Sequence, residues 1–304
     1  MVKLIFGCGY LGKRVGLRWI DAGHEVHTVT RRQEKATELT RHGFIAHVAD
    51  IRRPESLVGL PTADTVLFAV GYDRTSGESM YSVYVEGLAN VLNTVDSPKS
   101  RWIYVSSTGV FGESHADWID ETTIPHPQRE GGRVCLMAEQ TLQKSRFADR
   151  AVVLRMAGLY GPGRIPRRRE METGQSIATN PGSYLNLIHI DDAAAVVVGV
   201  DDCPGPPSLL LVSDGHPVQR RDYYDYIARL WGLPAPLLVA PPVVESEGRG
   251  IHEDVPRRAR GNKRIRNQLL RDTLPGVLRF PTYRDGLQSI VATEAKKEKE
   301  ANEG

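Results

Sequence analysis

The sequence predicts an α/β fold in which a doubly wound parallel sheet carries helices on both faces and a small lobe follows toward the C-terminus. Three observations predict it. Short apolar runs alternate with segments of helical spacing over the first 160 residues or so. Several of these runs are continuously apolar, which is typical of parallel strands buried on both faces. The first run also passes directly into a glycine-rich turn and then a helix.

The N-terminal elements follow one another in the order that such a sheet requires. Val2–Phe6 is a short apolar run that ends at a glycine, so it predicts the first strand. Leu11, Val15 and Trp19 recur at helical spacing and predict a helix over Leu11–Ala22, which Gly23 ends. The other elements predicted in this half are the strands Glu25–Thr30, Phe44–Ala49, Thr65–Val70, Trp102–Ser106 and Ala151–Arg155 and the helices Gln33–His42, Tyr81–Val95 and Arg133–Lys144.

The pattern loosens beyond Tyr160. Gly161–Ser183 is rich in Gly, Pro and Arg and predicts a loop or small lobe. The elements predicted after it are the strands Tyr184–Ile190 and Leu209–Ser213, an extended connector over Pro234–Pro242, and the helices Asp191–Val200, Tyr223–Trp231, Lys263–Arg271 and Tyr283–Ala292.

These elements suggest where the domains divide. We expect residues 1–162 to form a dinucleotide-binding core that residues 184–214 complete. Residues 163–183 and 215–292 are expected to form a small substrate lobe. Residues 293–304 are rich in Lys and Glu without an apolar stripe, so we expect a polar tail with no fold of its own.

Composition excludes several classes of protein. The 304 residues carry 39 basic and 37 acidic side chains, a balance that argues against a dedicated nucleic-acid binder. The longest strongly apolar run, Ala193–Val200, is far short of the roughly 20 residues that a bilayer requires, and no apolar leader precedes the first strand. Three scattered cysteines indicate neither a disulfide framework nor a metal site. We therefore expect a cytoplasmic monomer or homodimer without membrane, nucleic-acid or metal partners.

The glycine-rich turn is the clearest functional motif. Gly7, Gly9 and Gly12 fit the pattern G-x-G-x-x-G between a first strand and a first helix. In a Rossmann-type fold the first glycine permits the tight turn, the second lets a pyrophosphate approach the backbone, and the third allows close packing of helix and strand. The turn predicts a dinucleotide site that Tyr10 and Leu11 also contact, with the N–H groups of the helix facing the phosphates.

The end of the second predicted strand favours NADP over NAD. An acidic residue there binds the ribose 2′-hydroxyl of NAD, whereas arginine accommodates the 2′-phosphate of NADP. This chain has Arg31 and Arg32 there and no carboxylate until Glu34. NAD stays an alternative, because two arginines after a strand could also be a solvated surface. Asp50 and Ile51 come at the end of the third strand, where Asp50 would bond the adenine amino group or cap the next helix before Pro54.

Five motifs in order resemble the extended short-chain dehydrogenase/reductases, the group of nucleotide-sugar epimerases and dehydratases. Besides the glycine turn they are Val66–Gly71, Tyr104–Gly112, Arg155–Gly163 and Ile188–Ala193. The glycine turn and the later segment Pro281–Leu287 are similar to those of the atypical, YeeZ-like bacterial subgroup. The resemblance spans about residues 2–200. It implies that Ser107 donates a hydrogen bond to the reacting oxygen of the substrate, and that Ser106, Ala69, Val70 and Gly71 line the cofactor.

The chain departs from this group at the catalytic pair. Members use a Tyr as general acid/base and a Lys four residues later, which lowers the pKa of that Tyr and holds the ribose. None of the eleven tyrosines here has a Lys at that spacing. Aligning the helix on Ala138 and Glu139 puts Gly131 at the Tyr position and Cys135 at the Lys position. Cys135 could have a lowered pKa near a helix start, but a buried structural cysteine is commoner.

Two functions remain open. The protein could be an NADP-dependent oxidoreductase or epimerase-like enzyme of this atypical kind, acting on a small, anionic or nucleotide-sugar substrate. Ser107 and a second group, such as the charge of Arg133, would polarise that substrate. It could instead be a non-catalytic NADP(H)-sensing protein, because the fold hosts unrelated functions.

Further polar residues have weaker interpretations. The basic residues of Arg167–Arg169, and a later group, could contact an anionic substrate or form a solvated face. The later group comprises Arg257, Arg258, Arg260, Lys263, Arg264 and Arg266. Asp191 and Asp192 are expected to cap the helix that follows them, and His189 to pack rather than bind a ligand.

Overall fold

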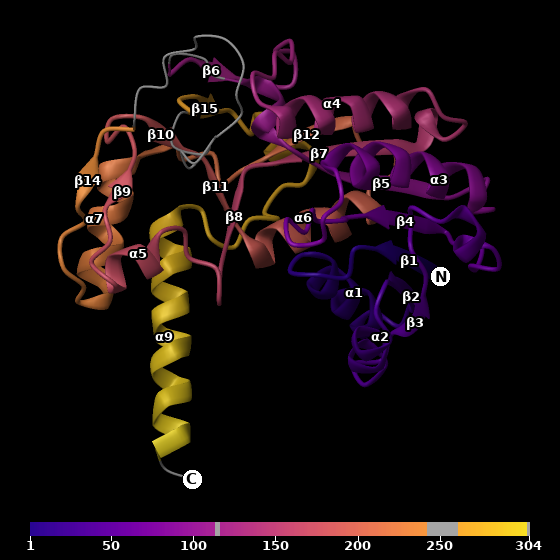
Figure 1. Ribbon diagram of the computed structural model, residues 1–304, viewed down its shortest axis with the longest axis horizontal. Helices are drawn as coiled ribbons and strands as arrows, with labels where there is room; N and C mark the ends of the chain where they lie inside the picture. The colour runs from indigo at the N-terminus through magenta and orange to yellow at the C-terminus, as the bar shows by residue number, and fades with distance from the viewer. Residues whose placement is uncertain (113–115, 242–260, 303–304) are drawn as a thin grey trace.

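The computed structural model describes residues 1–112, 116–241 and 261–302, and its centre is a seven-stranded parallel sheet (Figure 1). The strands lie in the order β12 (Leu209–Val212), β7 (Ala151–Met156), β5 (Arg101–Ser107), β4 (Thr65–Phe68), β1 (Val2–Phe6), β2 (Glu25–Thr30) and β3 (Ile45–Val48). The order reverses between β1 and β4, as in a doubly wound sheet. The predicted Rossmann-type fold class is confirmed.

Helices cover both faces of the sheet (Figure 1). One face carries α1 (Gly12–Asp21), α2 (Gln33–Thr40) and α6 (Ile190–Asp202), and the other carries α3 (Gly87–Thr94) and α4 (Glu130–Gln143). Successive side chains of a strand point to opposite faces. Ile5 of β1 therefore packs with the α1 layer while Leu4 and Phe6 pack with the α3 layer, which explains the continuously apolar runs.

The register brings the carboxyl ends of the central strands to one edge. Phe6 of β1 pairs with Val29 of β2 on one side and with Phe68 of β4 on the other. Ser107, the last residue of β5, pairs with Met156, the last residue of β7. Ligands of open α/β sheets bind outside this edge, at the reversal of strand order.

A smaller lobe lies beside the sheet, at the left of Figure 1. Its core contains Tyr223, Ile227 and Leu287. Its elements are α5 (Arg168–Glu172), α7 (Arg220–Trp231), α9 (Tyr283–Asn302) and the strand pairs β9 (Ile177–Ala178) with β14 (Leu238–Val239) and β10 (Tyr184–Leu185) with β13 (Val218–Gln219). The parallel pair β8 (Gly158–Tyr160) and β11 (Leu187–His189) leads from the sheet to this lobe.

The helix predicted over Lys263–Arg271 is mostly wrong. Its first part is the strand β15 (Arg264–Ile265), which pairs with β6 (Trp118–Ile119), and only α8 (Gln268–Thr273) is helical. The backbone N–H of Ile265 donates to Oδ1 of Asn186 at 2.7 Å, and the Ile265 side chain is fully buried. Tertiary contacts therefore override the local helical pattern.

Further elements differ from the prediction, among them the strand predicted over Tyr184–Ile190, which is the two short strands β10 and β11. The helix predicted over Tyr81–Val95 begins with a π-helical turn, η2 (Ser82–Glu86), before α3. Residues 293–302, expected to be part of a tail without structure, continue α9 instead. Glu294 anchors this part, because its carboxylate accepts hydrogen bonds from Nε1 of Trp231 at 2.9 Å and from Arg168 at 2.8 Å.

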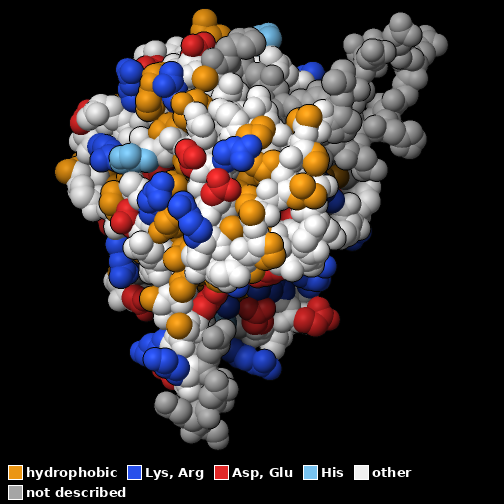
Figure 2. Space-filling model, turned by 90° about the vertical axis from the view of Figure 1, so that its left-hand side faces the viewer, with side chains coloured by type: hydrophobic (Ala, Val, Ile, Leu, Met, Phe, Trp, Pro, Cys, Tyr) orange, Lys and Arg blue, Asp and Glu red, His pale blue; other side chains and the backbone are white. Residues whose placement is uncertain are grey.

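The surface mixes charges of both signs. On the face that carries the lobe, basic, acidic and apolar side chains are interspersed (Figure 2).

Within residues 1–112, 116–241 and 261–302, no helix combines the length and apolarity that crossing a bilayer demands. The remaining short elements are the 3₁₀ turns η1 (Pro54–Leu57), η3 (Thr108–Phe111) and η4 (Ala148–Arg150).

Candidate functional site

A cleft of about 770 Å³ opens at the carboxyl edge of the sheet. Its size is in the range of sites for small molecules and cofactors. Thirteen of the fourteen predicted site residues line it: Gly7, Gly9, Tyr10, Leu11, Arg31, Arg32, Asp50, Ile51, Ala69, Val70, Gly71, Ser106 and Ser107. Gly12 is the exception, because it lies under the turn at the start of α1.

The three glycines of the turn differ in what a side chain at each position would contact. Gly7 has a φ of +92°, and a Cβ there would lie 2.4 Å from the carbonyl oxygen of Ala69. A Cβ at Gly12 would lie 2.3 Å from the carbonyl oxygen of Gly7. A Cβ at Gly9 would meet no protein atom within 4 Å, so only something placed in the cleft would require a glycine there. Leu11 provides no side-chain cap for α1. The N–H of Lys13 donates to the carbonyl oxygen of Gly9 at 3.0 Å, and the start of the helix otherwise has no side-chain cap that would compete with an anion.

The two arginines that follow the second strand line the cleft. Arg31 and Arg32 are exposed at the end of β2. Within the described part of the chain, the nearest carboxylate oxygen to the Arg31 guanidinium belongs to Asp73, at a loose 3.9 Å, and both side chains are about half exposed. Such a pair contributes little stability. The Arg31 guanidinium is therefore only weakly engaged by the protein itself.

Asp50 faces the cleft but is held by a neighbour. Its carboxylate accepts hydrogen bonds from the backbone N–H, Nε and Nη2 of Arg52, at 3.0, 3.1 and 2.6 Å. Burial acts to raise the pKa of Asp50, but these bonds outweigh it and hold the pKa below its usual value. Asp50 therefore stays ionised and closes a local turn with Arg52. It does not cap η1, which has Arg53 at its N-cap and no side-chain cap, so the capping alternative is wrong. Its bond to an adenine stays a prediction.

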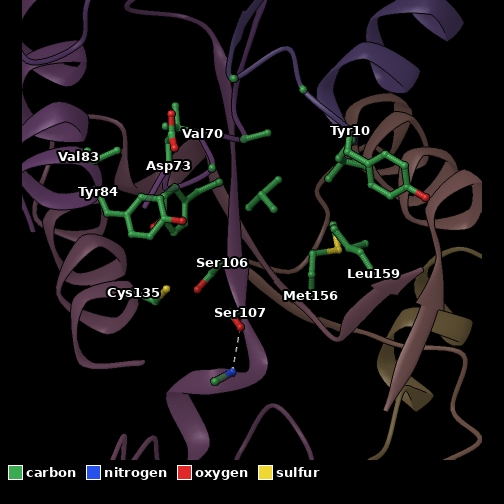
Figure 3. Close-up of a pocket in the computed structure, with 18 of the residues that line it drawn as sticks. Tyr10, Val70, Asp73, Val83, Tyr84, Ser106, Ser107, Cys135, Met156 and Leu159 are labelled. Carbon is green, nitrogen blue, oxygen red and sulfur yellow. Dashed lines mark hydrogen bonds between the residues drawn. The ribbon is translucent and has the colours of Figure 1, made fainter. Parts of the chain in front are cut away.

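The two serines at the end of β5 point to different partners (Figure 3). Ser106 donates its hydroxyl proton to the buried carboxylate of Glu139, which in turn pairs with Arg155 at 2.7 Å. The hydroxyl oxygen of Ser107 accepts a hydrogen bond from the backbone N–H of Gly109 at 3.0 Å. That bond orients Ser107 and leaves its own proton for a ligand in the cleft.

Helix α4 provides neither a phenol nor an ammonium group at the predicted catalytic positions. A Cβ at Gly131 would meet only Met80, at an ordinary 3.5 Å. Burial, and then the nearby Glu139, raise the pKa of Cys135 to about 11, so this thiol is neutral at pH 7. The exposed Arg133 donates to the carbonyl of Gln128 at 2.8 Å and does not line the cleft, so its predicted polarising role has no support.

Of the described basic residues that the sequence marked as candidate contacts of an anionic substrate, only Lys263 lines the cleft, whereas Arg164 and Arg220 were not singled out. The Arg167–Arg169 cluster does not line the cleft, and Arg168 pairs with Glu172 and Glu294 instead. Arg164, Arg220 and Lys263 do line the cleft. Of the later basic group, Arg257, Arg258 and Arg260 lie outside the described residues.

Hydrogen bonds to oxygen atoms of other segments hold Lys263 and Arg220 in place. Nζ of Lys263 donates to the carbonyl oxygens of Thr108 and Gly112, at 2.7 and 3.1 Å. Nε of Arg220 donates to Oγ of Ser183 at 2.8 Å. These bonds fix two positive charges in the lining of the cleft.

The motif around His189 has a structural role. The ring is buried between Tyr160 and Phe280, and burial lowers its pKa to about 4. Its Nδ1 accepts a hydrogen bond from the backbone N–H of Asp191, so the histidine caps α6 rather than the aspartates expected to do so. Asp192 instead accepts the backbone N–H groups of Arg279 and Phe280.

Comparison with known proteins gives concordant results. A model of the NAD dependent epimerase/dehydratase family matches residues 4–200. Protein YeeZ of Escherichia coli K12 is 28% identical over 240 residues, which is 76% of this chain and 84% of that protein. A solved structure from Methylobacillus flagellatus, described provisionally as an NAD-dependent epimerase/dehydratase, is 30% identical with a TM-score of 0.76 and covers 96% of this chain and 98% of its own.

A more distant structure shares the fold. The UDP-glucose 4-epimerase of Thermotoga maritima, solved with UDP-glucose, is 17% identical with a TM-score of 0.77, covering 98% of this chain and 99% of that one.

Proposed function

This chain belongs to the NAD-dependent epimerase/dehydratase family, and from this premise we propose that it binds NADP(H) in the cleft and acts as an oxidoreductase or epimerase on a small, anionic, nucleotide-sugar-type substrate. One observation carries the proposal. A single cleft joins a bare glycine turn and two arginines at one end to an oriented serine hydroxyl and fixed cations at the other.

The residues at the glycine turn suit the phosphates of a dinucleotide. Gly9 and the uncapped start of α1 would hold the pyrophosphate. Arg31 and Arg32 would bind the 2′-phosphate, because guanidinium groups form bidentate bonds with phosphate oxygens. Ala69–Gly71 and Ser106 would line the remainder of the cofactor. When bound, the nicotinamide supplies hydride transfer.

Ser107 would act on the substrate. Because its oxygen accepts from Gly109, its proton is directed to an oxygen of the substrate as charge develops there. Arg164, Arg220 and Lys263 would attract the anionic part of the substrate. The nucleotide-sugar class is supported by structures of the same fold, since the Thermotoga maritima relative was solved with UDP-glucose.

A second function is favoured by helix α4. With Gly131 and the neutral thiol of Cys135 at the positions of the missing pair, the cleft has no evident base on this helix. A protein with this cleft could report NADP(H) without turnover. In that case the lobe would respond to the bound cofactor rather than position a substrate.

Cofactor titration tests the premise that both functions share. The fluorescence of NADPH and of NADH should change on addition of protein, with NADPH bound more tightly because of Arg31. Absence of binding at millimolar concentrations of either dinucleotide would rule out both functions.

Turnover then separates the two functions. A panel of UDP- and dTDP-sugars is incubated with protein and cofactor, and product formation and cofactor absorbance are followed. An enzyme should lose about 100-fold or more of its rate in Ser107→Ala while its affinity for NADPH stays unchanged. Tight binding with no turnover over the panel would favour the sensor.

A further inference from the structure

A tyrosine that the family resemblance did not point to projects into the cleft. Tyr84 belongs to the π-helical turn η2, and its ring reaches into the cavity beside Cys135 and above Ser106 (Figure 3). Single π-helical turns occur frequently at functional sites, because the extra residue reorients the side chains around it. Burial of its neighbours Val83 and Val85 fixes this turn against the sheet.

The hydroxyl of Tyr84 is held in one orientation. Its oxygen accepts a hydrogen bond from the backbone N–H of Tyr72 at 2.9 Å. The two rings meet edge to face, with centroids 6.5 Å apart. Since the backbone N–H occupies one lone pair, the phenol keeps its own proton to donate, and no acceptor for it is found among the described residues.

The phenol keeps this proton at all ordinary pH values. Burial is the main reason that the pKa of Tyr84 lies above its usual value, and the nearby Cys135 raises it further. A neutral phenol in a cleft is a hydrogen-bond donor. It is suited to a neutral or anionic oxygen of a ligand.

The position of Tyr84 indicates which half of a bound dinucleotide it would contact. With the pyrophosphate on the glycine turn and the adenosine half toward Arg31, the other half must extend toward the end of β5. Tyr84 lies on that path, between the backbone that follows Gly71 and the pair Ser106 and Cys135. The polar groups of this half nearest the pyrophosphate are the ribose hydroxyls.

We propose that Tyr84 binds the nicotinamide-side ribose, with its phenol donating a hydrogen bond to a ribose oxygen. The inference rests on the proposed function and adds a binding residue to it. Tyr84 performs this task in the part of the cleft where helix α4 offers only the neutral thiol of Cys135.

The test compares a whole dinucleotide with its adenosine half. Wild type, Tyr84→Phe and the control Tyr72→Phe are titrated with NADPH and with adenosine 2′,5′-bisphosphate, which lacks the second ribose. Tyr72→Phe removes a hydroxyl from the same aromatic pair, one that donates to the carbonyl of Glu78 and lies outside the cleft lining. Melting temperatures verify that each variant is folded.

We expect Tyr84→Phe to bind NADPH about tenfold more weakly, the effect of one hydrogen bond, and to bind the bisphosphate as wild type does. Tyr72→Phe should bind both ligands normally. An unchanged affinity of Tyr84→Phe for NADPH, or an equal loss for both ligands, would overturn the inference. If wild type binds neither ligand, the proposed function fails, and this inference fails with it.

Discussion

At the residue scale, the three glycines of the turn are equivalent in the sequence motif but not in the structure. Gly7 and Gly12 are required by the backbone itself, because a Cβ at either would overlap a carbonyl group. At Gly9, by contrast, a Cβ would meet no protein atom within 4 Å, so the fold itself does not require a glycine there. A glycine that the fold does not need, at the edge of a cleft, points to a ligand that approaches the backbone there.

This difference makes a prediction. Gly9→Asp should leave the melting temperature nearly unchanged, since the new side chain meets open space, but should abolish binding of NADPH, because its carboxylate would occupy and repel the pyrophosphate. Gly12→Ala is the matched control and should destabilise the fold by about 1–3 kcal/mol through overlap with Gly7. Thermal melts and fluorescence titration measure the two effects. A folded Gly9→Asp that binds NADPH normally would contradict the assigned phosphate site.

At the element scale, one buried network joins α4 to the strands beneath the cleft. Glu139 of α4 accepts from Ser106 of β5 and pairs with Arg155 of β7, and the side chains of Glu139 and Arg155 are 1% and 5% exposed. This network fixes the end of β5 that carries Ser107. It also uses the hydroxyl proton of Ser106, so this residue can present only its oxygen lone pairs to a cofactor.

Glu139→Gln should therefore be costly. Removing one charge leaves Arg155 buried without its counter-ion, which lowers the free energy of unfolding by about 3–5 kcal/mol. Glu294→Gln also loses a pairing with an arginine, but one that is partly exposed, and should cost less than about 1 kcal/mol. Urea denaturation of both variants gives the comparison. If both variants lost the same free energy of unfolding, the buried pair of Glu139 and Arg155 would contribute no more to stability than the partly exposed pair of Glu294 and Arg168.

At the scale of the whole molecule, a buried carboxyl group sits where the core meets the lobe. Asp214 follows β12, its backbone N–H donates to the carbonyl of Leu187 in β11, and its own carbonyl accepts from Arg271 at 2.9 Å. Burial raises the pKa of Asp214 to about 8. The group is therefore protonated in the folded protein at neutral pH, whereas its pKa in the unfolded chain is about 3.9.

The sign of the pH dependence follows from these two values. The stability linked to neutral Asp214 is fully present below about pH 4 and is lost as the pH rises toward 8, because the unfolded chain releases its proton first. Asp214→Asn removes this loss. The free energy of unfolding of the variant minus that of wild type should increase from pH 5 to pH 8, as measured by urea denaturation.

Other groups, such as His189 with its lowered pKa, are common to both proteins and cancel in this difference. A difference that stays constant over the range would contradict the buried, protonated state of Asp214.

The sequence by itself determined the central sheet and the glycine-turn end of the cleft. Strand periodicity, the glycine turn and Arg31 after the second strand are local patterns, and a parallel sheet places the ends of its strands at one edge whatever the surface details. The absence of the catalytic Tyr and Lys from α4 was also visible in the sequence, because aligning the helix on Ala138 and Glu139 puts Gly131 and Cys135 at their positions.

Only the tertiary structure decided which side chains occupy the rest of the cleft. Lys263 bonds to Thr108, 155 residues away, and Ile265 is a strand residue only because Asn186 and β6 lie beside it. Tyr84 reaches the cavity through a π-helical turn that its helical spacing does not reveal. Contacts between distant segments are set by the packing of the whole chain, which no local pattern encodes.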